Sequence, residues 1–146
     1  MIAKDKIIIP MLIDSHNQWF VDCWILLNSK IKTVRFKVDT GCNALVLSHD
    51  TLERFGYSTH PTKLSKLSPM TGTLASGDKH VFRKIGVVSL YRDIKRTVHI
   101  CDAKSICHSS HETHDLLGTE VLRQFGGVTF SLDSKKFIEL RRKCHD

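Results

Sequence analysis

One short segment of the sequence combines a carboxylate with the setting that could make it reactive. Asp39, Thr40 and Gly41 follow an alternating apolar and basic stretch, 34–38, and precede a second apolar stretch, 44–47. This pattern predicts a turn between two buried strands, where backbone amides hold the aspartate and partial desolvation tunes its pKa. Such a carboxylate suits general acid or base chemistry. The alternative is a turn acid that only caps local amides.

A second group of residues has the side chains that bind metal ions. Cysteine and histidine suit zinc, and five of them lie close together in the sequence: Cys101, Cys107, His108, His111 and His114. Their spacing matches no zinc pattern, and the three histidines would share a face only on a helix. We therefore predict a polar, solvated loop over 104–115, with no metal and no cofactor.

The first half of the chain predicts strands that lead to the Asp39 segment and one short helix after it. Three strands are expected, at 7–13, 19–27 and 34–38, as an antiparallel meander. Ser48 is a candidate N-cap for a helix over 49–55, and Gly56 ends that helix. The segment 59–69, which holds two prolines, predicts a loop or an irregular strand.

The second half predicts further strands, a hairpin and one more helix. Ser76, Gly77 and Asp78 separate two runs that favour strands, which is typical of a hairpin. The run 119–125, closed by two glycines, predicts a short amphipathic helix. The other expected strands are 72–75, 80–85, 87–91, 97–101, 128–132 and 137–140. The chain therefore reads as a mostly β domain with short helices.

With these elements in place, the segment from Phe36 to Ser48 resembles the active-site segment of retropepsin-like (retroviral-type) aspartic proteases. Further matches follow in the family's order and extend the resemblance over about 34–140. Residues 73–78 resemble the flap hairpin that closes over substrate, 86–90 the strand after it, Leu116-Leu117-Gly118 the segment beneath the catalytic turn, and 119–125 the family's helix.

The resemblance implies a fold and a set of site residues. The fold is a mostly β, closed-barrel-like acid-protease domain with a flap hairpin, one lobe per chain, and residues 1–146 form a single domain. The implied catalytic residues are Asp39, Thr40 and Gly41; the implied flap is Leu74, Ala75, Ser76, Gly77 and Asp78; the implied support under the active site is Leu116, Leu117 and Gly118.

The activity implied by the resemblance is that of an aspartic endopeptidase acting on peptides or proteins. Without a metal or a covalent nucleophile, one carboxylate must deprotonate water and one carboxylic acid must polarise the scissile carbonyl. In aspartic proteases, two carboxylates about 3 Å apart share one proton and so divide these roles. Asp14 and Asp133 lack the following glycine, so Asp39 is the one suitable aspartate. We therefore expect a homodimer that contributes one Asp39 from each copy.

Some positions depart from the retroviral pattern. Cys42 stands where retroviral enzymes usually have a small residue such as alanine, and it brings a thiol next to the catalytic pair. Thr119 and Glu120 begin the helix where retroviral enzymes have an arginine that supports the dimer. The chain is also longer before Trp19 and in the 92–115 region. These differences favour a cellular or bacterial member of the family over a viral one.

Length and composition limit the remaining possibilities. A chain of 146 residues, 41% hydrophobic and 25% charged, has room for one domain and not for two protease lobes. The apolar run 7–13 is too short for a signal-peptide core or a bilayer span, so we expect a cytoplasmic protein without a membrane partner. Five cysteines without a framework spacing favour free thiols.

Two other functions compete with proteolysis. A retropepsin-like domain that no longer cleaves could serve as a dimerising or peptide-binding module. The net charge of +7 could indicate a nucleic-acid binder. However, the basic residues are dispersed and no recognition fingerprint accompanies them, so we expect no nucleic-acid partner.

Overall fold

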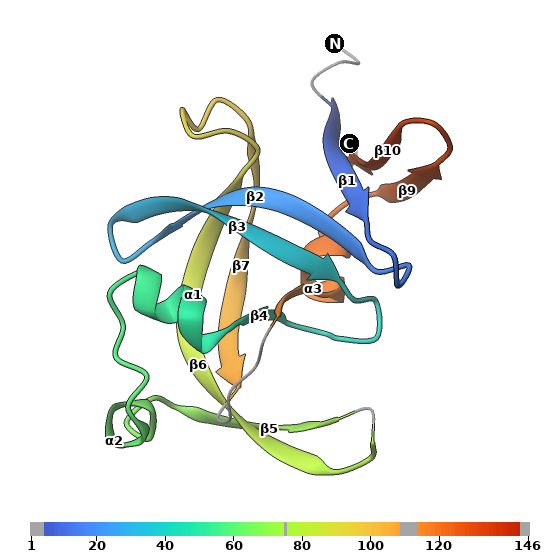
Figure 1. The fold of residues 1–146 in the computed structure, drawn as a ribbon. Coiled ribbons are helices and arrows are strands. Elements are labelled where there is room, and N and C mark those ends of the chain that lie inside the picture. The colour runs from blue at the N-terminus through green and yellow to red at the C-terminus, as the bar shows by residue number, and fades with distance from the viewer. Residues whose placement is uncertain (1–4, 75, 109–113, 144–146) are drawn as a thin grey trace.

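The computed structural model describes residues 5–74, 76–108 and 114–143, and Figure 1 shows the arrangement of their ten strands and three helices. The strands are β1 (Lys6–Ile13), β2 (Trp19–Leu27), β3 (Lys30–Val38), β4 (Leu45–Leu47), β5 (Pro69–Thr73), β6 (Lys79–Tyr91), β7 (His99–His108), β8 (Asp115–Leu117), β9 (Gly127–Leu132) and β10 (Lys136–Arg141). The helices are α1 (His49–Arg54), α2 (Pro61–Leu64) and α3 (Thr119–Leu122). The predicted mostly β class is confirmed.

Six of the strands close into a barrel. Around the ring, β2 pairs with β3, β3 with β8, β8 with β4, β4 with β7 and β7 with β6. The ring closes because β6 also pairs with β2, with Trp24 opposite Tyr91. The β3–β8 and β4–β7 pairs are parallel and the other four are antiparallel. Closure gives each strand of the ring a neighbour on both sides and leaves no aggregation-prone edge there.

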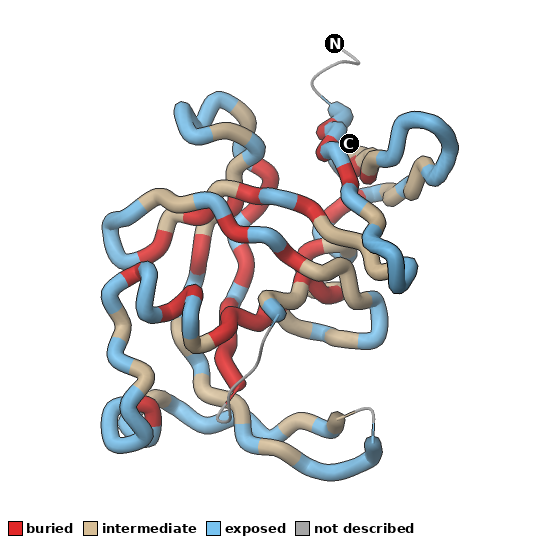
Figure 2. The backbone as a smooth tube through the Cα atoms, in the orientation of Figure 1, coloured by how far each residue is buried: buried red, intermediate tan, exposed pale blue. Residues whose placement is uncertain are grey.

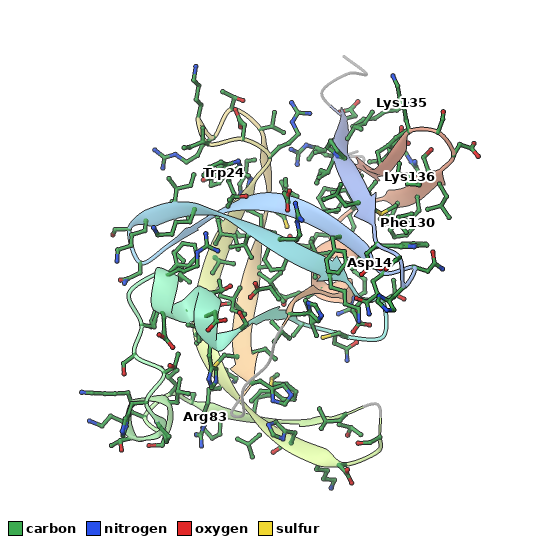
Figure 3. All side chains as sticks on the ribbon, viewed as in Figure 1. Asp14, Trp24, Arg83, Phe130, Lys135 and Lys136 are labelled. Carbon is green, nitrogen blue, oxygen red and sulfur yellow. The ribbon has the colours of Figure 1, made fainter. Side chains whose placement is uncertain are left out.

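A three-stranded sheet made of β1, β10 and β9 extends from the barrel. The first part of β1 pairs with β10, and its last three residues pair with β2. On the inner face of this sheet, Ile7 and Ile138 are buried, and the ring of Phe130, labelled in Figure 3, lies 5.2 Å from that of Trp19. β9 is the outer strand of this sheet.

The three strands and the helix predicted before Gly56 are confirmed. β1, β2 and β3 form an antiparallel meander. The Ser48 side chain accepts a hydrogen bond from the Thr51 amide and so caps α1, while Gly56 adopts a φ of 89° just after the helix. Such a positive φ suits glycine because it has no Cβ. Local sequence signals were sufficient here because these strands pair with strands adjacent in sequence and the helix cap joins residues three positions apart.

Two predictions are corrected, one for β6 and one for β7. One strand, β6, replaces the separate strands expected at 80–85 and 87–91, because a register shift at Gly86 bends the strand without ending it. β7 runs to His108, so the first part of the loop expected over 104–115 is a strand. Ala103, Ser105 and Cys107 are buried there while Lys104 is exposed, which is the alternation of a strand in a barrel wall.

Two helical segments also differ from expectation. α2 forms one helical turn inside the segment 59–69 that predicted a loop or irregular strand, because Pro61 stands at the start of the turn and Leu64 is buried. α3 ends at Leu122 and is followed by turns, whereas the sequence predicted a helix to Phe125. In both cases a short stretch packs on the barrel, which local propensity does not reveal.

Burial follows this architecture (Figure 2). The barrel interior is filled by fully buried apolar side chains, among them Val34, Phe36, Leu45, Leu47, Leu52 and Leu90. The β5–β6 hairpin and the turn between β9 and β10 are mostly exposed. No helix within the described ranges is long and apolar enough to cross a membrane.

Candidate active site

The Asp39 turn, residues 39–43, begins where β3 ends. The Asp39 carboxylate accepts a hydrogen bond from the Gly41 amide (3.0 Å), and the Asp39 carbonyl accepts one from the Cys42 amide (3.1 Å). Asp39 is partly buried, whereas Thr40 and Gly41 are exposed. A Cβ on Gly41 would lie 3.3 Å from a carboxylate oxygen of Asp39, so glycine allows this close approach. The turn thus holds an accessible carboxylate with one oxygen bonded to an amide.

The strand β8 supports this turn from below. β8 lies between β3 and β4, with Leu117 opposite Val38 on one side and Leu45 on the other. The Leu117 carbonyl accepts a hydrogen bond from the Asp39 amide (3.0 Å). Leu117 is buried and Leu116 is partly buried. The three-residue strand therefore fixes the backbone of Asp39 directly.

Gly118 continues this support into α3. A Cβ at Gly118 would lie 2.3 Å from the Cys42 carbonyl oxygen and 2.5 Å from that of Ala44, so the two backbones touch where no other residue fits. The amides of Thr119 and Glu120 donate to the carbonyls of Cys42 (2.9 Å) and Asn43 (2.8 Å). The segment 117–120 thus makes three backbone hydrogen bonds to the Asp39 turn.

Cys42 lies in the same turn and is partly buried. Its thiol donates to the Ala44 carbonyl oxygen (3.5 Å). Burial raises the pKa of the Cys42 thiol and the neighbouring Asp39 charge raises it further, while an interaction with the Ala44 backbone lowers it. The side chain is therefore a neutral thiol at neutral pH and adds no second charge beside Asp39.

The segment predicted as a flap forms the tip of the β5–β6 hairpin. The Leu74 amide donates to the Asp78 carbonyl (2.8 Å), and the Gly77 amide donates to the Leu74 carbonyl (2.9 Å). The Ser76 hydroxyl bonds the Asp78 carboxylate (3.1 Å), and Gly77 has a φ of 90°. The predicted flap residue Ala75 lies outside the described residues. In Figure 1 the hairpin extends below the barrel, and its tip reaches the same side as the loop between β3 and β4.

An aromatic cluster, formed by His80, Phe82 and His108, holds the base of this hairpin on β7. The His80 and His108 rings are 4.0 Å apart, and the Phe82 ring lies 4.8 Å from His108. Phe82 also covers Gly72, where a Cβ would come within 2.5 Å of its ring. Arg83, labelled in Figure 3, donates to the Leu67 carbonyl at the end of the α2 segment (3.2 Å). The sequence analysis missed this cluster, although His80 and Phe82 are spaced as two neighbours on one strand face.

Asp115 is a second residue that the sequence analysis missed. It begins β8, and its carboxylate accepts hydrogen bonds from the Ser48 amide and the Thr51 hydroxyl, both at 2.7 Å. Burial raises the pKa of the Asp115 carboxyl, and the hydrogen bonds from Ser48 and Thr51 partly oppose this shift. The one sequence signal was its position directly before the apolar pair of β8, inside the segment expected to be a loop.

The described cysteines and histidines considered for a metal site lie on β7 and directly before β8, not in the Asp39 turn. Cys101 and Cys107 are buried on β7, and burial raises the pKa of the Cys101 thiol to about 12. The His114 ring lies 5.9 Å from that of Phe20, and His111 is outside the described residues. Among the residues that the structure describes, no three such side chains are placed to hold a metal ion.

Two surface cavities also lie away from the predicted site. One of about 590 Å³ is lined by Glu53 and residues 56–60, and one of about 400 Å³ is lined by residues 99–102, Gln124, Phe125, Arg142 and Lys143. None of these is a predicted site residue. Neither cavity is lined by a residue of the Asp39 turn or by a described residue of the flap tip.

Comparisons with known proteins agree with this architecture. No protein-family model and no curated protein matches the sequence. Among solved structures, the chain is similar to a retropepsin-like aspartic protease from Rickettsia conorii, with a TM-score of 0.58 and 17% identity over 94% of this chain and 93% of that one. EIAV protease in complex with an inhibitor aligns with a TM-score of 0.40 and 17% identity over 70% of this chain and 84% of that one. The first similarity confirms the predicted retropepsin-like fold.

Proposed function

We propose that this chain is an aspartic endopeptidase whose active site forms between two copies, with one Asp39 from each. The observation that supports this most is the combination of a partly buried Asp39 beside exposed Thr40 and Gly41 with a retropepsin-like barrel. The three hydrogen bonds from segment 117–120 add to it, because a catalytic carboxylate must be held in place.

In the proposed mechanism, the two Asp39 carboxyl groups share one proton. The ionised carboxylate takes a proton from water while the water oxygen attacks the scissile carbonyl carbon. The protonated carboxyl gives its hydrogen to the carbonyl oxygen, which forms a tetrahedral diol. The proton held by the first carboxylate then passes to the amide nitrogen, and as the carbon–nitrogen bond breaks, one diol hydroxyl returns its proton to the second carboxylate. Acid and amine products leave, and the shared proton is restored.

The second copy is needed because the chain supplies one Asp-Thr-Gly turn. Thr40 is exposed in the single chain, so its hydroxyl is available to the partner copy at a two-fold axis. β9 pairs with β10 and, among the described strands, with no other, so its outer edge suits the joining of two terminal sheets. The flap tips, including Leu74, Ser76 and Gly77, would close over a peptide and exclude water.

The test is a cleavage assay of the purified chain on a peptide library at acidic and neutral pH, with and without an aspartic-protease inhibitor. We expect inhibitor-sensitive cleavage, and we expect Asp39→Asn to abolish it while leaving the fold and dimer intact. Asp14→Asn is a matched control, because Asp14 is also a turn acid, bonded to the amides of His16 and Gln18 at 2.9 Å. This control should cleave like the wild type.

The same measurements separate the proposal from its alternative. Cleavage retained by Asp39→Asn would refute the mechanism. A wild-type chain that stays monomeric by sedimentation and cleaves nothing would favour a peptide-binding module without activity. Binding of DNA or RNA that weakens steeply with salt would instead indicate a nucleic-acid partner.

A further inference from the structure

Asp115 is a partly buried residue whose carboxyl group has no role in the proposed mechanism. Asp115 lies at the opposite end of β8 from Gly118, and neither the Asp39 pair nor the flap uses it. It is the described carboxyl group whose pKa is raised, with burial as the main cause. Burial of a carboxyl group is costly unless hydrogen bonds compensate it, and here the two bonds of 2.7 Å to Ser48 and Thr51 do so.

The Asp115 side chain ties β8 to the start of α1. One carboxylate oxygen accepts a hydrogen bond from the Ser48 amide, and the other accepts one from the Thr51 hydroxyl. Ser48 and Thr51 are themselves joined, because the Thr51 amide donates to the Ser48 hydroxyl oxygen (3.2 Å) and the two hydroxyls are 3.1 Å apart. Both residues are buried. The carboxylate is therefore part of a closed network that includes the α1 cap.

A short path leads from this network to Asp39. β4 ends at Leu47, next to Ser48, and pairs antiparallel with β8. At the other end of the same β4–β8 pair, the Leu117 carbonyl accepts a hydrogen bond from the Asp39 amide, and Gly118 is in close backbone contact with the Asp39 turn. The pair is only three residues long, so both of its ends influence its position. The β4–β8 pair is therefore held at one end by Asp115 and at the other end by its contacts with the Asp39 turn.

We propose that Asp115 is a positioning residue for Asp39, which it holds in place through β8 by bonding Ser48 and Thr51 at the start of α1. The proposal rests on the proposed function, since it assigns Asp115 to the geometry of the Asp39 pair. In this proposal Asp115 itself makes no contact with substrate or with the reacting carboxylates. Asp115 fixes the position of Leu117 and Gly118 beneath the Asp39 turn. This matters because a small displacement of a catalytic group lowers the rate by a large factor.

The hydrogen-bond chemistry predicts which substitution preserves this function. In Asp115→Asn, the amide oxygen accepts the Ser48 amide, and the amide NH₂ donates to the Thr51 hydroxyl, which turns its own proton toward Ser48. The two groups that bond Asp115 in the wild type, the Ser48 amide and the Thr51 hydroxyl, both keep a partner. Asp115→Ala leaves the Ser48 amide and the Thr51 hydroxyl without this partner. The asparagine variant should therefore rescue what the alanine variant loses.

The experiment compares these two variants in the full chain by steady-state kinetics and by hydrogen exchange of the Asp39 amide. For Asp115→Ala we expect kcat to fall about ten- to a hundredfold with KM within about twofold, and the Asp39 amide to exchange faster. Asp115→Asn should match the wild type in both. Asp93→Ala is the matched control, because Asp93 also accepts bonds from two amides and a threonine hydroxyl, but in an exposed turn between β6 and β7.

Each outcome decides the proposal. If Asp115→Ala folds and keeps both kcat and slow Asp39 exchange, Asp115 only caps α1 and the proposal is overturned. If the wild type cleaves nothing, the proposed function fails, and the exchange rate still decides whether Asp115 holds the Asp39 turn. If Asp115→Ala does not fold, Thr51→Val removes one of the two bonds at nearly constant volume. It should then show the same changes in a smaller degree, and its failure to do so would overturn the proposal.

Discussion

The Asp39 turn and the flap tip are both exposed loops between strands, yet they are held in different ways. The Asp39 turn receives three backbone hydrogen bonds from segment 117–120, which is distant in sequence. The described hydrogen bonds of the flap tip run between its own residues, such as Leu74 and Asp78. A Cβ at Gly118 would meet backbone at 2.3 Å, whereas one at Gly77 would meet nothing within 4 Å.

The Asp39 turn is therefore held firmly by the barrel, whereas the flap tip is held less firmly. Under the proposed function, this contrast suits a carboxylate that acts at a fixed place and a hairpin whose tip moves to admit and release a peptide. The aromatic cluster of His80, Phe82 and His108 marks where the anchored part of the hairpin ends. Substitutions at three glycines and one change of pH test this contrast.

The largest effect is expected for Gly118→Ala. The added methyl would overlap the carbonyl oxygens of Cys42 and Ala44, and backbone atoms cannot rotate away as a side chain can. We expect a loss of about 3 kcal/mol or more in the free energy of unfolding, with loss of any cleavage activity. Urea denaturation followed by circular dichroism measures the stability. A variant as stable as the wild type would show that the support under the Asp39 turn is loose.

A smaller effect is expected for Gly72→Ala at the base of the flap. Its methyl would meet the Phe82 ring at 2.5 Å, and the ring can shift, although it would then disturb its packing against His108. We expect a loss of about 1–2 kcal/mol. The double variant with Phe82→Leu should recover part of this loss, because the obstructing ring is gone. No recovery would place the strain in the backbone and not in the aromatic cluster.

Gly77→Ala at the flap tip should have less effect on folding. Alanine at a φ of 90° is strained by about 1 kcal/mol, but no neighbouring atom obstructs the methyl. We expect a shift of about 1 kcal/mol or less in unfolding and a larger change in KM than in kcat. A loss of stability comparable to that of Gly118→Ala would contradict the contrast drawn between the two loops.

The smallest effect concerns pH and the anchor at Asp115. Unfolded Asp115 loses its proton near its ordinary pKa of 3.8, and burial in the folded chain raises that pKa. Between the two values the folded state holds the extra proton, so the free energy of unfolding falls as pH rises through this window. Asp115→Asn should remove this slope while leaving the rest of the curve in place. The measurement is the free energy of unfolding of the wild type and of Asp115→Asn from pH 3 to 7. The difference between the two curves gives the contribution of Asp115.

The sequence was a reliable guide where a signal is local. The alternation over 34–38 in β3, the Ser48 cap and the Gly56 stop of α1 each depend on a few neighbouring residues. The order of the Asp-Thr-Gly turn, the hairpin and the Leu-Leu-Gly segment also indicated the fold, which the Rickettsia conorii structure confirms. The catalytic role of Asp39 remains a prediction.

Local signals failed where long-range packing decides. The polar residues of β7 looked like a loop, but its small side chains face the barrel interior while Lys104 faces water. The bend at Gly86 resembled the end of a strand, yet pairing with β7 carries β6 through it. Asp115 resembled a loop residue because its partners, Ser48 and Thr51, lie more than 60 positions away.

The sequence by itself determined that the chain has one Asp-Thr-Gly turn, and from it the catalytic role of Asp39 is predicted. It did so because the aspartate and its glycine are encoded in consecutive residues. The tertiary structure alone decided how that turn is held, because β8 and Gly118 reach it only after the barrel closes. The physical reason is that a carboxylate is positioned by backbone contacts distant in sequence, and such contacts exist only in the folded chain.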